Sequence, residues 1–103
     1  MKTFSDLKSN DHIYVLYLLS GIIEEVKITQ VQFHKSDIII FSTEEYNNRF
    51  WFYKDKSIEI DSDNMVKYIA DKNMVSCELY KLIKSCKVII KTAKQNIQKL
   101  KEL

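Results

Sequence analysis

The stretch DKNMVSCELYKLIKSCKVIIKTAKQNIQKLKEL, residues 71–103, decides the fold, because here the hydrophobic pattern changes from that of strands to that of a helix. Apolar or small residues, with one asparagine among them, recur at alternating spacings of four and three: Val75, Leu79, Leu82, Cys86, Ile89, Ala93, Asn96, Leu100 and Leu103. A row of Ile83, Ile90 and Ile97 widens this stripe. Asp71 is the expected N-cap. The pattern predicts one long amphipathic helix.

This stripe is longer than the rest of the chain can cover. At 1.5 Å per residue the helix spans roughly 50 Å, whereas a barrel of about 60 residues is roughly 27 Å across. Either the helix bends around the sheet, or its distal half packs against another helix through Ile83, Ile89, Ile90, Ala93, Ile97 and Leu100. Small residues in the stripe permit close approach, and Asn96 can fix the register. A second copy is the simplest partner, so we expect a homodimer.

The two cysteines, Cys77 and Cys86, are expected to be free. On one helix, nine residues turn through about 900° and advance about 13 Å, which places the two thiols on opposite sides and beyond disulfide reach. We expect both to be buried.

Residues 11–70 show short apolar runs separated by polar turns, which is typical of strands. The expected strands are 12–18, 22–33, 38–42, 49–54 and 57–60, and a strand is favoured over a helical turn at 65–70. Within 22–33 the apolar positions change parity, which indicates a bulge or a bend. We expect one α+β domain over residues 1–103: a bent five-stranded antiparallel sheet or small barrel (11–70), followed by one long C-terminal amphipathic helix (71–103).

The charge of the chain is unevenly distributed. The net charge is +2, too small to indicate a nucleic-acid or membrane partner. Residues 1–70 carry eight basic and eleven acidic side chains, whereas residues 71–103 carry eight lysines and three acidic side chains. No stretch reaches the ~18 apolar residues of a membrane span, and the polar opening lacks the apolar core of a signal peptide. We expect a cytoplasmic protein without a membrane partner.

Residues with catalytic or metal-binding potential do not form a recognisable motif. The single glycine and the absence of proline exclude glycine-rich phosphate loops. The segment 61–64 begins like a calcium loop but lacks the later glycine and glutamate. His12 and His34 have no cysteine or carboxylate at ligand spacing. We expect no catalytic residue, no metal and no cofactor.

The run Phe50-Trp51-Phe52-Tyr53 carries rings on both faces of a strand, because successive side chains alternate. We assign Phe50 and Phe52 to the core and Trp51 and Tyr53 to the outer face. Two alternatives remain for this outer face. Either Trp51 and Tyr53, with Arg49, form a binding surface, or the C-terminal helix covers them.

The lysines of the predicted helix suggest a second function. The rows on the far side of the helix are positioned to contact phosphates, and they consist of Lys84, Lys87, Lys91, Lys94 and Lys101. The predicted helix has no arginine, the residue that reads guanine in a bidentate manner. Such binding would therefore be non-specific, and a solvated helix face is the simpler interpretation.

Residues 11–31, with Asp-His-Ile-Tyr-Val, Gly-Ile-Ile and Val-Lys-Ile, resemble the opening of SH3-like or KOW-type small barrels. This resemblance implies a binding module for protein or nucleic acid rather than an enzyme. The opening Lys-Thr-Phe-Ser-Asp-Leu-Lys before a small β domain and a lysine-rich helix also resembles small proteins of phages and mobile elements.

These observations together favour a non-enzymatic interaction module that associates with itself through its helix, such as an accessory or inhibitory protein of a phage or mobile element. The alternative is a non-specific nucleic-acid-binding barrel that uses the aromatic strand and the lysine-rich helix.

Overall fold

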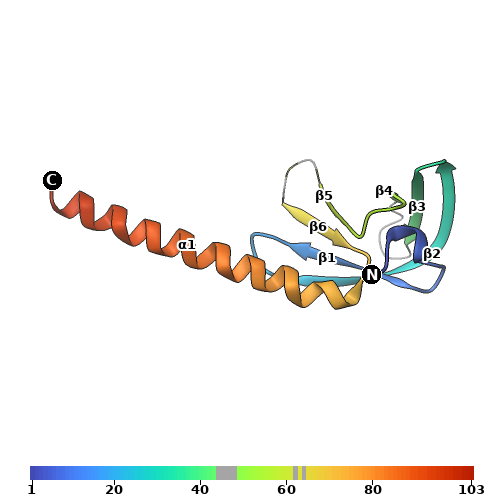
Figure 1. Cartoon of the computed structure of the whole chain (residues 1–103), viewed down its shortest axis with the longest axis horizontal. Helices are drawn as coiled ribbons and strands as arrows, with labels where there is room; N and C mark the ends of the chain where they lie inside the picture. The colour runs from blue at the N-terminus through green and yellow to red at the C-terminus, as the bar shows by residue number, and fades with distance from the viewer. Residues whose placement is uncertain (44–48, 62, 64) are drawn as a thin grey trace.

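The computed structural model describes residues 1–43, 49–61, 63 and 65–103. It has one antiparallel, nearly closed barrel-like sheet followed by one long helix, so the expected α+β class is confirmed (Figure 1). The elements are η1 (Phe4–Asp6), β1 (His12–Tyr17), β2 (Ile23–Lys35), β3 (Ile38–Thr43), β4 (Arg49–Tyr53), β5 (Ile58–Ile60), β6 (Val66–Ile69), η2 (Lys72–Met74) and α1 (Val75–Lys101).

The described part of the sheet has six strands rather than five, in the order β4-β3-β2-β1-β6-β5. The additional strand is β6, in the segment where the sequence favours a strand over a helical turn. It pairs with β1 on one side and β5 on the other, which places the end of the chain's β region in the middle of the sheet.

Strand β2 carries the sheet around a corner. It pairs with β1 from Ile23 to Lys27 and with β3 from Ile28 to Lys35. The pairing with β3 shifts register between Ile28 and Gln30, where the parity of the apolar positions also changes. The bulge or bend predicted from the sequence is therefore confirmed, and it lets one strand belong to both halves of the barrel.

The core contains buried aliphatic and aromatic side chains from the strands and from the N-terminal segment. Phe4, in η1, is fully buried and stacks on Phe52 at 4.1 Å between ring centroids. Its backbone N–H donates to the carbonyl of Lys56 at 2.8 Å, so η1 closes one end of the barrel beneath the β4–β5 connection. The sequence analysis assigned the β region to residues 11–70 and did not anticipate this contribution.

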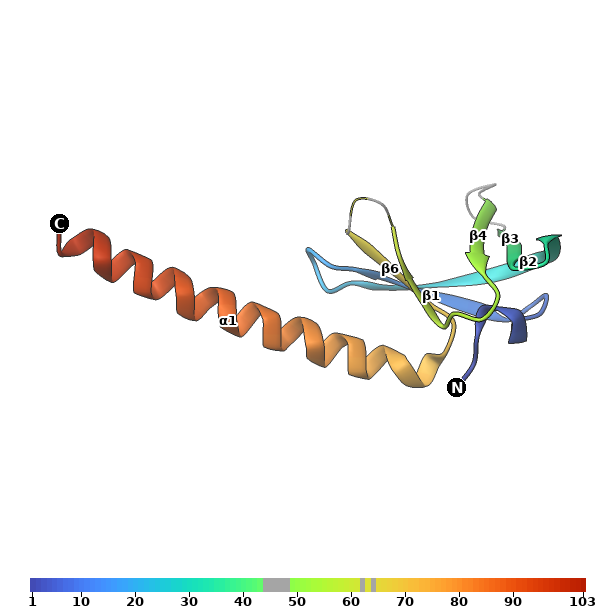
Figure 2. The same ribbon diagram turned by 45° about the horizontal axis from the view of Figure 1, so that its top comes forward.

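The helix begins later than the sequence predicts. The Asp71 side chain accepts a hydrogen bond from the N–H of Asn73 at 3.0 Å, which confirms its capping role, but the first turn is the 3-10 helix η2. Hydrogen bonds from the N–H groups of Lys2 and Asn73 lower the pKa of the Asp71 carboxyl. Helix α1 then continues without a bend around the sheet (Figure 2).

The helix gives the molecule its shape. Only its first turns lie beside the barrel, and the rest projects beyond it (Figures 1 and 2). The principal extents are 59 × 26 × 24 Å. The bent-helix alternative is therefore excluded, and the part of the helix that outruns the sheet extends away from it.

Candidate interaction site

The first turns of α1 are attached to the barrel by a buried ionic cluster. Glu78 is 3% exposed, and its carboxylate oxygens accept hydrogen bonds from Lys67 Nζ of β6 at 2.8 Å and from Lys81 Nζ at 3.1 Å. Burial raises the pKa of Glu78, but the hydrogen bonds and charges of Lys67 and Lys81 outweigh it, so the pKa lies below its ordinary value. The cluster therefore links the helix to the sheet when the Glu78 carboxylate is ionised.

Apolar contact with the barrel ends within two turns. Leu79 and Leu82 are half-buried. A Cβ atom at Gly21, in the β1–β2 turn, would lie 3.8 Å from Leu82 Cδ2. Gly21 has a φ of +74°, a conformation that a side chain would strain. This turn therefore combines a left-handed residue with close approach of the helix.

Beyond Leu82 every side chain of α1 is exposed. The apolar surface in this part of the helix, here called the distal stripe, consists of Ile83, Cys86, Ile89, Ile90, Ala93, Ile97 and Leu100. Ile97 is 53% exposed and Leu100 is 69% exposed. The interface predicted from the sequence contains six of these seven residues, and the structure places all seven on one connected strip of a single helix.

The distal stripe continues the face on which the barrel sits. Cys86, Ala93 and Leu100 follow Leu79 at intervals of seven residues, which returns nearly to the same side of a helix. Ile89 follows Leu82 at the same interval. The helix therefore presents one apolar side along its length, of which the barrel covers only the first part.

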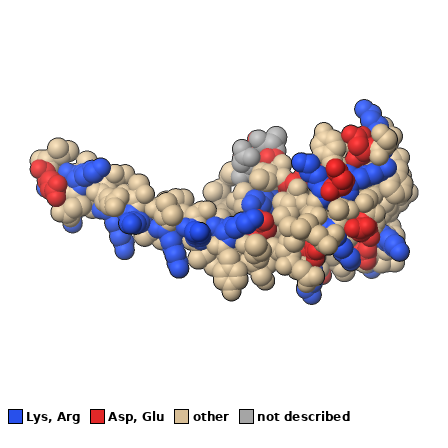
Figure 3. Space-filling model, viewed as in Figure 1, with Lys and Arg blue, Asp and Glu red and all other residues tan. Residues whose placement is uncertain are grey.

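The five lysines proposed as phosphate contacts are exposed. At 100° per residue, Lys84 and Lys91 lie away from the distal stripe, as expected. Lys87, Lys94 and Lys101 instead flank the stripe next to its isoleucines, so the expected position on the far side is wrong for these three. Figure 3 shows most lysine side chains of the helix along its front and lower edge, whereas the barrel rises on the upper side. From Ile83 to Lys101 this helix carries six lysines and no acidic side chain. The part of the helix surface outside the distal stripe is accordingly a continuous basic surface.

The expectation about the cysteines is wrong in one respect. Cys77 and Cys86 are free, as expected, but both are exposed. Cys86 lies beyond Leu82, where the barrel no longer covers the stripe.

On β4, the predicted alternation is confirmed. Phe52 is buried and Phe50 is half-buried, whereas Arg49, Trp51 and Tyr53 are exposed. Trp51 is 58% exposed and meets Tyr53 edge-on at 6.1 Å between ring centroids. The helix does not cover this face, so the alternative in which all four rings are structural is wrong.

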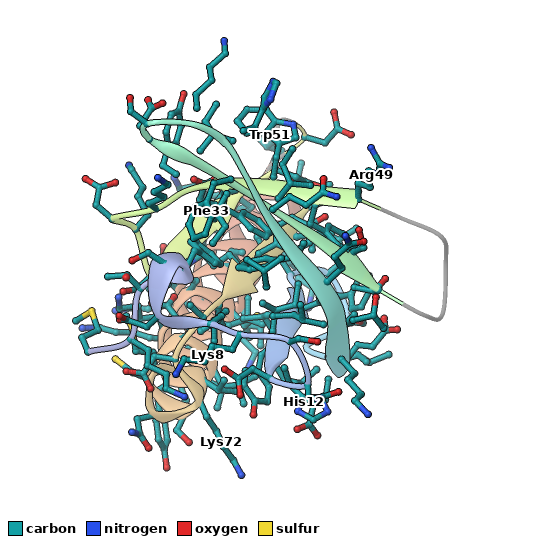
Figure 4. The ribbon with its side chains drawn as sticks, turned by 90° about the vertical axis from the view of Figure 1, so that its right-hand side faces the viewer. Lys8, His12, Phe33, Arg49, Trp51 and Lys72 are labelled. Carbon is teal, nitrogen blue, oxygen red and sulfur yellow. The ribbon has the colours of Figure 1, made fainter. Side chains whose placement is uncertain are left out.

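The two proposed nucleic-acid surfaces do not form one site. Figure 4 shows Trp51 and Arg49 on one side of the barrel and Lys72, just before the helix, on the opposite side. In Figure 1, β4 lies at the end of the molecule away from the distal helix. The lysines of the distal helix and the aromatic strand therefore belong to two separate surfaces.

The polar side chains with catalytic potential are dispersed. Among the described residues, no group of three histidine, cysteine or carboxylate side chains is arranged to hold a metal ion. His12 Nδ1 lies 3.7 Å from Glu25 Oε1, and the hydroxyl group of Tyr14 donates to that same oxygen at 3.4 Å.

The Glu78 cluster was not predicted, because its only signal in the sequence is a lone acidic residue in the first turns of a lysine-rich helix. Within the described residues, no helix has the length and apolar character to cross a membrane.

No family model, curated protein or solved structure matches the chain.

Proposed function

We propose that the protein is a non-enzymatic interaction module that associates with a second copy of itself through the distal stripe. The observation that carries the proposal is the exposure of this stripe, which continues the face that the barrel covers. Four isoleucines at half exposure or more on one strip of helix form an apolar surface that water solvates poorly. A second copy of the chain presents the same stripe and can cover this surface, so no partner of a different kind is needed.

The barrel restricts how two such helices pair. Packed helices have axes about 8–10 Å apart, whereas the molecule is 24–26 Å across in its two short directions. Each barrel sits on the side of its helix that would face the partner. In a parallel pair both barrels would occupy the same space, so the two helices run antiparallel, and the C-terminal end of each stops at the partner's barrel.

The pattern of large and small residues suggests a register for this pair. When Ile90 lies opposite the partner's Ala93, Ile83 lies opposite the partner's Leu100 and Cys86 lies opposite the partner's Ile97. Two of these three layers combine a larger with a smaller side chain, which allows the two helices to approach closely at those layers.

The lysines determine how this association responds to salt. In the antiparallel register Lys87 approaches the partner's Lys94, and no acidic side chain lies between them. Salt screens this repulsion, so dimer affinity should increase between about 0.05 and 0.5 M salt. Phosphate binding by the same lysines would weaken over that range, which separates the two functions by the sign of one measurement.

The experiment combines mass and cross-linking. Light scattering of the wild type should give twice the 12.3 kDa mass of the chain, and the variant with Ile90→Asp and Ile97→Asp should give one mass with unchanged β structure. The Cys77→Ser background leaves Cys86 as the only thiol. Adding Ile97→Cys should then produce disulfide-linked dimers on mild oxidation, because Cys86 faces position 97 of the partner.

Matched variants control this experiment. Cys77→Ser alone should cross-link poorly, because the two Cys86 residues of an antiparallel pair are about 16 Å apart along the axis. Efficient cross-linking through Cys86 alone would contradict the antiparallel arrangement. A monomeric wild type at high micromolar concentration would contradict the proposed function.

The second candidate function is non-specific nucleic-acid binding, and the observation that favours it is the continuous basic side of α1. Titration of a generic oligonucleotide tests it. The variant with Lys87→Gln, Lys94→Gln and Lys101→Gln should reduce the slope of log affinity against log salt by about 0.7 for each lost contact with a single strand. No binding at low salt would exclude this candidate.

A further inference from the structure

The barrel is open between β4 and β5. These strands follow one another in the chain, yet they lie at the two ends of the sheet order and are not paired with each other. A groove of about 490 Å³ lies between them, here called the β4–β5 groove. Its size falls within the ~300–1,000 Å³ range that is usual for binding sites.

Both walls of the groove direct backbone hydrogen-bonding groups into it. On β4, the N–H of Tyr53 points toward β5, where it donates to Glu59 Oε1 at 2.8 Å, whereas the N–H of Lys54 donates toward β3, to the carbonyl of Asp37. Because these directions alternate along a strand, the peptide groups of Trp51 and Arg49 also point toward the groove.

The same reasoning applies to β5. The carbonyl of Ser57 accepts from the N–H of Ala70, and the N–H of Asp61 donates to the carbonyl of Val66, so these residues face β6. The intervening Ile58 and Ile60 therefore direct their peptide groups away from β6 and toward the groove. Apart from the bonds that Tyr53 makes with Glu59 and Lys56, no described residue hydrogen-bonds to these peptide groups, and the two strand edges face each other across the groove.

One end of the groove is closed. The hydrogen bond between Tyr53 and Glu59 joins the two walls there, and the N–H groups of Phe4 and Ser5 satisfy the carbonyls of Lys56 and Lys54 in the connecting turn. We therefore expect an occupant to lie along the two walls between this closed end and Arg49.

The lining of the groove favours a particular chemistry. Phe50, Phe52 and Tyr68 form an aromatic floor, with ring centroids of Tyr68 at 5.5 Å from Phe50 and 5.4 Å from Phe52. Glu59 and Asp61 place two carboxylates on the β5 wall. Burial, followed by the charge of Asp61, raises the pKa of the Tyr68 hydroxyl, so this negative charge acts on the floor.

We propose that the β4–β5 groove accepts an extended segment of a partner protein as a further strand, with a lysine or arginine side chain directed between the two carboxylates and the aromatic floor. The backbone edges supply main-chain hydrogen bonds and the floor supplies the specificity. A cation above aromatic rings and beside carboxylates is stabilised by both. This site does not depend on association through the distal stripe.

Selection of peptides tests the proposal. The wild-type protein is used to select from random decapeptides displayed on phage, and the enriched peptides are synthesised and titrated by calorimetry. We expect enriched sequences that alternate, contain lysine or arginine, and lack proline in their central positions.

A proline at position 60 is the decisive variant. Because the N–H of Ile60 points into the groove rather than toward β6, Ile60→Pro removes a donor for the peptide while leaving the ladder with β6 intact. We expect it to weaken binding at least about tenfold, whereas Ile60→Thr, which keeps the N–H, should weaken it less. Asp61→Asn, which keeps the oxygen that accepts from Met65 and Val66, should lower the preference for basic peptides.

Each result bears on the proposal. Failure to enrich any peptide, or equal binding to the wild type and Ile60→Pro, would overturn it, as would enrichment of acidic sequences. Pairing of β4 with a second copy, or a single-stranded oligonucleotide that occupies the groove, would also overturn it. The variant with Ile90→Asp and Ile97→Asp should bind the peptides as the wild type does, which separates failure of this site from failure of the helix interface.

Discussion

Isoleucines in the barrel and in the distal helix have opposite fates in this molecule. Ile13, Ile28 and Ile39 are fully buried, whereas Ile89 and Ile97 are more than half exposed. The residue type is the same in both regions, and each region follows the hydrophobic period of its own secondary structure. The difference is that the apolar faces of the barrel strands pack together in one core, whereas the helix continues beyond the barrel that covers its first turns. An amphipathic pattern thus predicts which side of an element avoids water, and it does not identify what covers that side.

The largest effect is expected in the barrel. Phe52→Ala removes a ring that stacks on Phe4 and lies 5.9 Å from Phe41 between centroids, so it should lower the free energy of unfolding by about 3–5 kcal/mol. Urea unfolding followed by circular dichroism measures this loss. Val88→Ala is the matched control in the helix, where Val88 is 60% exposed on the side opposite the stripe, and it should change stability by less than about 0.5 kcal/mol. Similar losses for both variants would contradict the contrast between the two regions.

An intermediate effect is expected where the two regions meet. Glu78→Gln should lower the free energy of unfolding by about 1–3 kcal/mol at neutral pH, because a neutral amide with one acceptor oxygen replaces the carboxylate whose two oxygens accept from Lys67 and Lys81. The pKa of Glu78 is lower in the folded than in the unfolded chain, so its ionised form stabilises the fold above the unfolded pKa of about 4.3. That contribution is lost as the pH falls through the folded pKa.

The measurement is urea unfolding of the wild type and Glu78→Gln between about pH 3 and pH 7. The two curves should converge at the acidic end. Glu102→Gln is the control, since Glu102 is exposed at the end of the helix and should leave the pH profile unchanged. A difference between wild type and Glu78→Gln that persists undiminished at about pH 3 would contradict the role of the ionised carboxylate.

Much of the fold follows from local patterns in the sequence. The period of residues 75–103 predicts the helix, the apolar runs predict the strands within one or two residues, and the change of parity in β2 predicts its bend. The absence of glycine and proline from the helix also accounts for its unbent course beyond the barrel, since nothing interrupts its backbone hydrogen bonds.

The features that escaped prediction depend on contacts between distant residues. In the sequence, Phe4 is a lone aromatic residue within a polar N-terminal segment. It is buried because η1 closes one end of the barrel. Glu78 and Lys67 come together because the helix turns back beside β6. Cys86 was expected to be buried because the pattern places it on the apolar side, but the position where the barrel ends decides its exposure. The β4–β5 groove likewise arises from the failure of two strands to pair, which no local pattern encodes.

The smallest effect is expected on the outer face of β4, where Trp51 lies one residue from the buried Phe52. Trp51→Ala should lower the free energy of unfolding by less than about 1 kcal/mol, because the indole is more than half exposed and contacts Tyr53 only edge-on. As the single tryptophan, Trp51 also reports on this face directly. Its emission should be red-shifted and readily quenched by acrylamide in the absence of peptide.

The same fluorescence separates the barrel from the helix during association. If the chain dimerises through the distal stripe, dilution through the dissociation range should leave the Trp51 emission unchanged, because β4 lies at the opposite end of the molecule from the distal helix (Figure 1). The variant with Ile90→Asp and Ile97→Asp provides the monomer reference for that titration. Emission that shifts to the blue as the wild type associates, but not in this variant, would mean that the face of β4 is buried together with the stripe. The interface would then include the barrel, and the separation of the two regions would have to be abandoned.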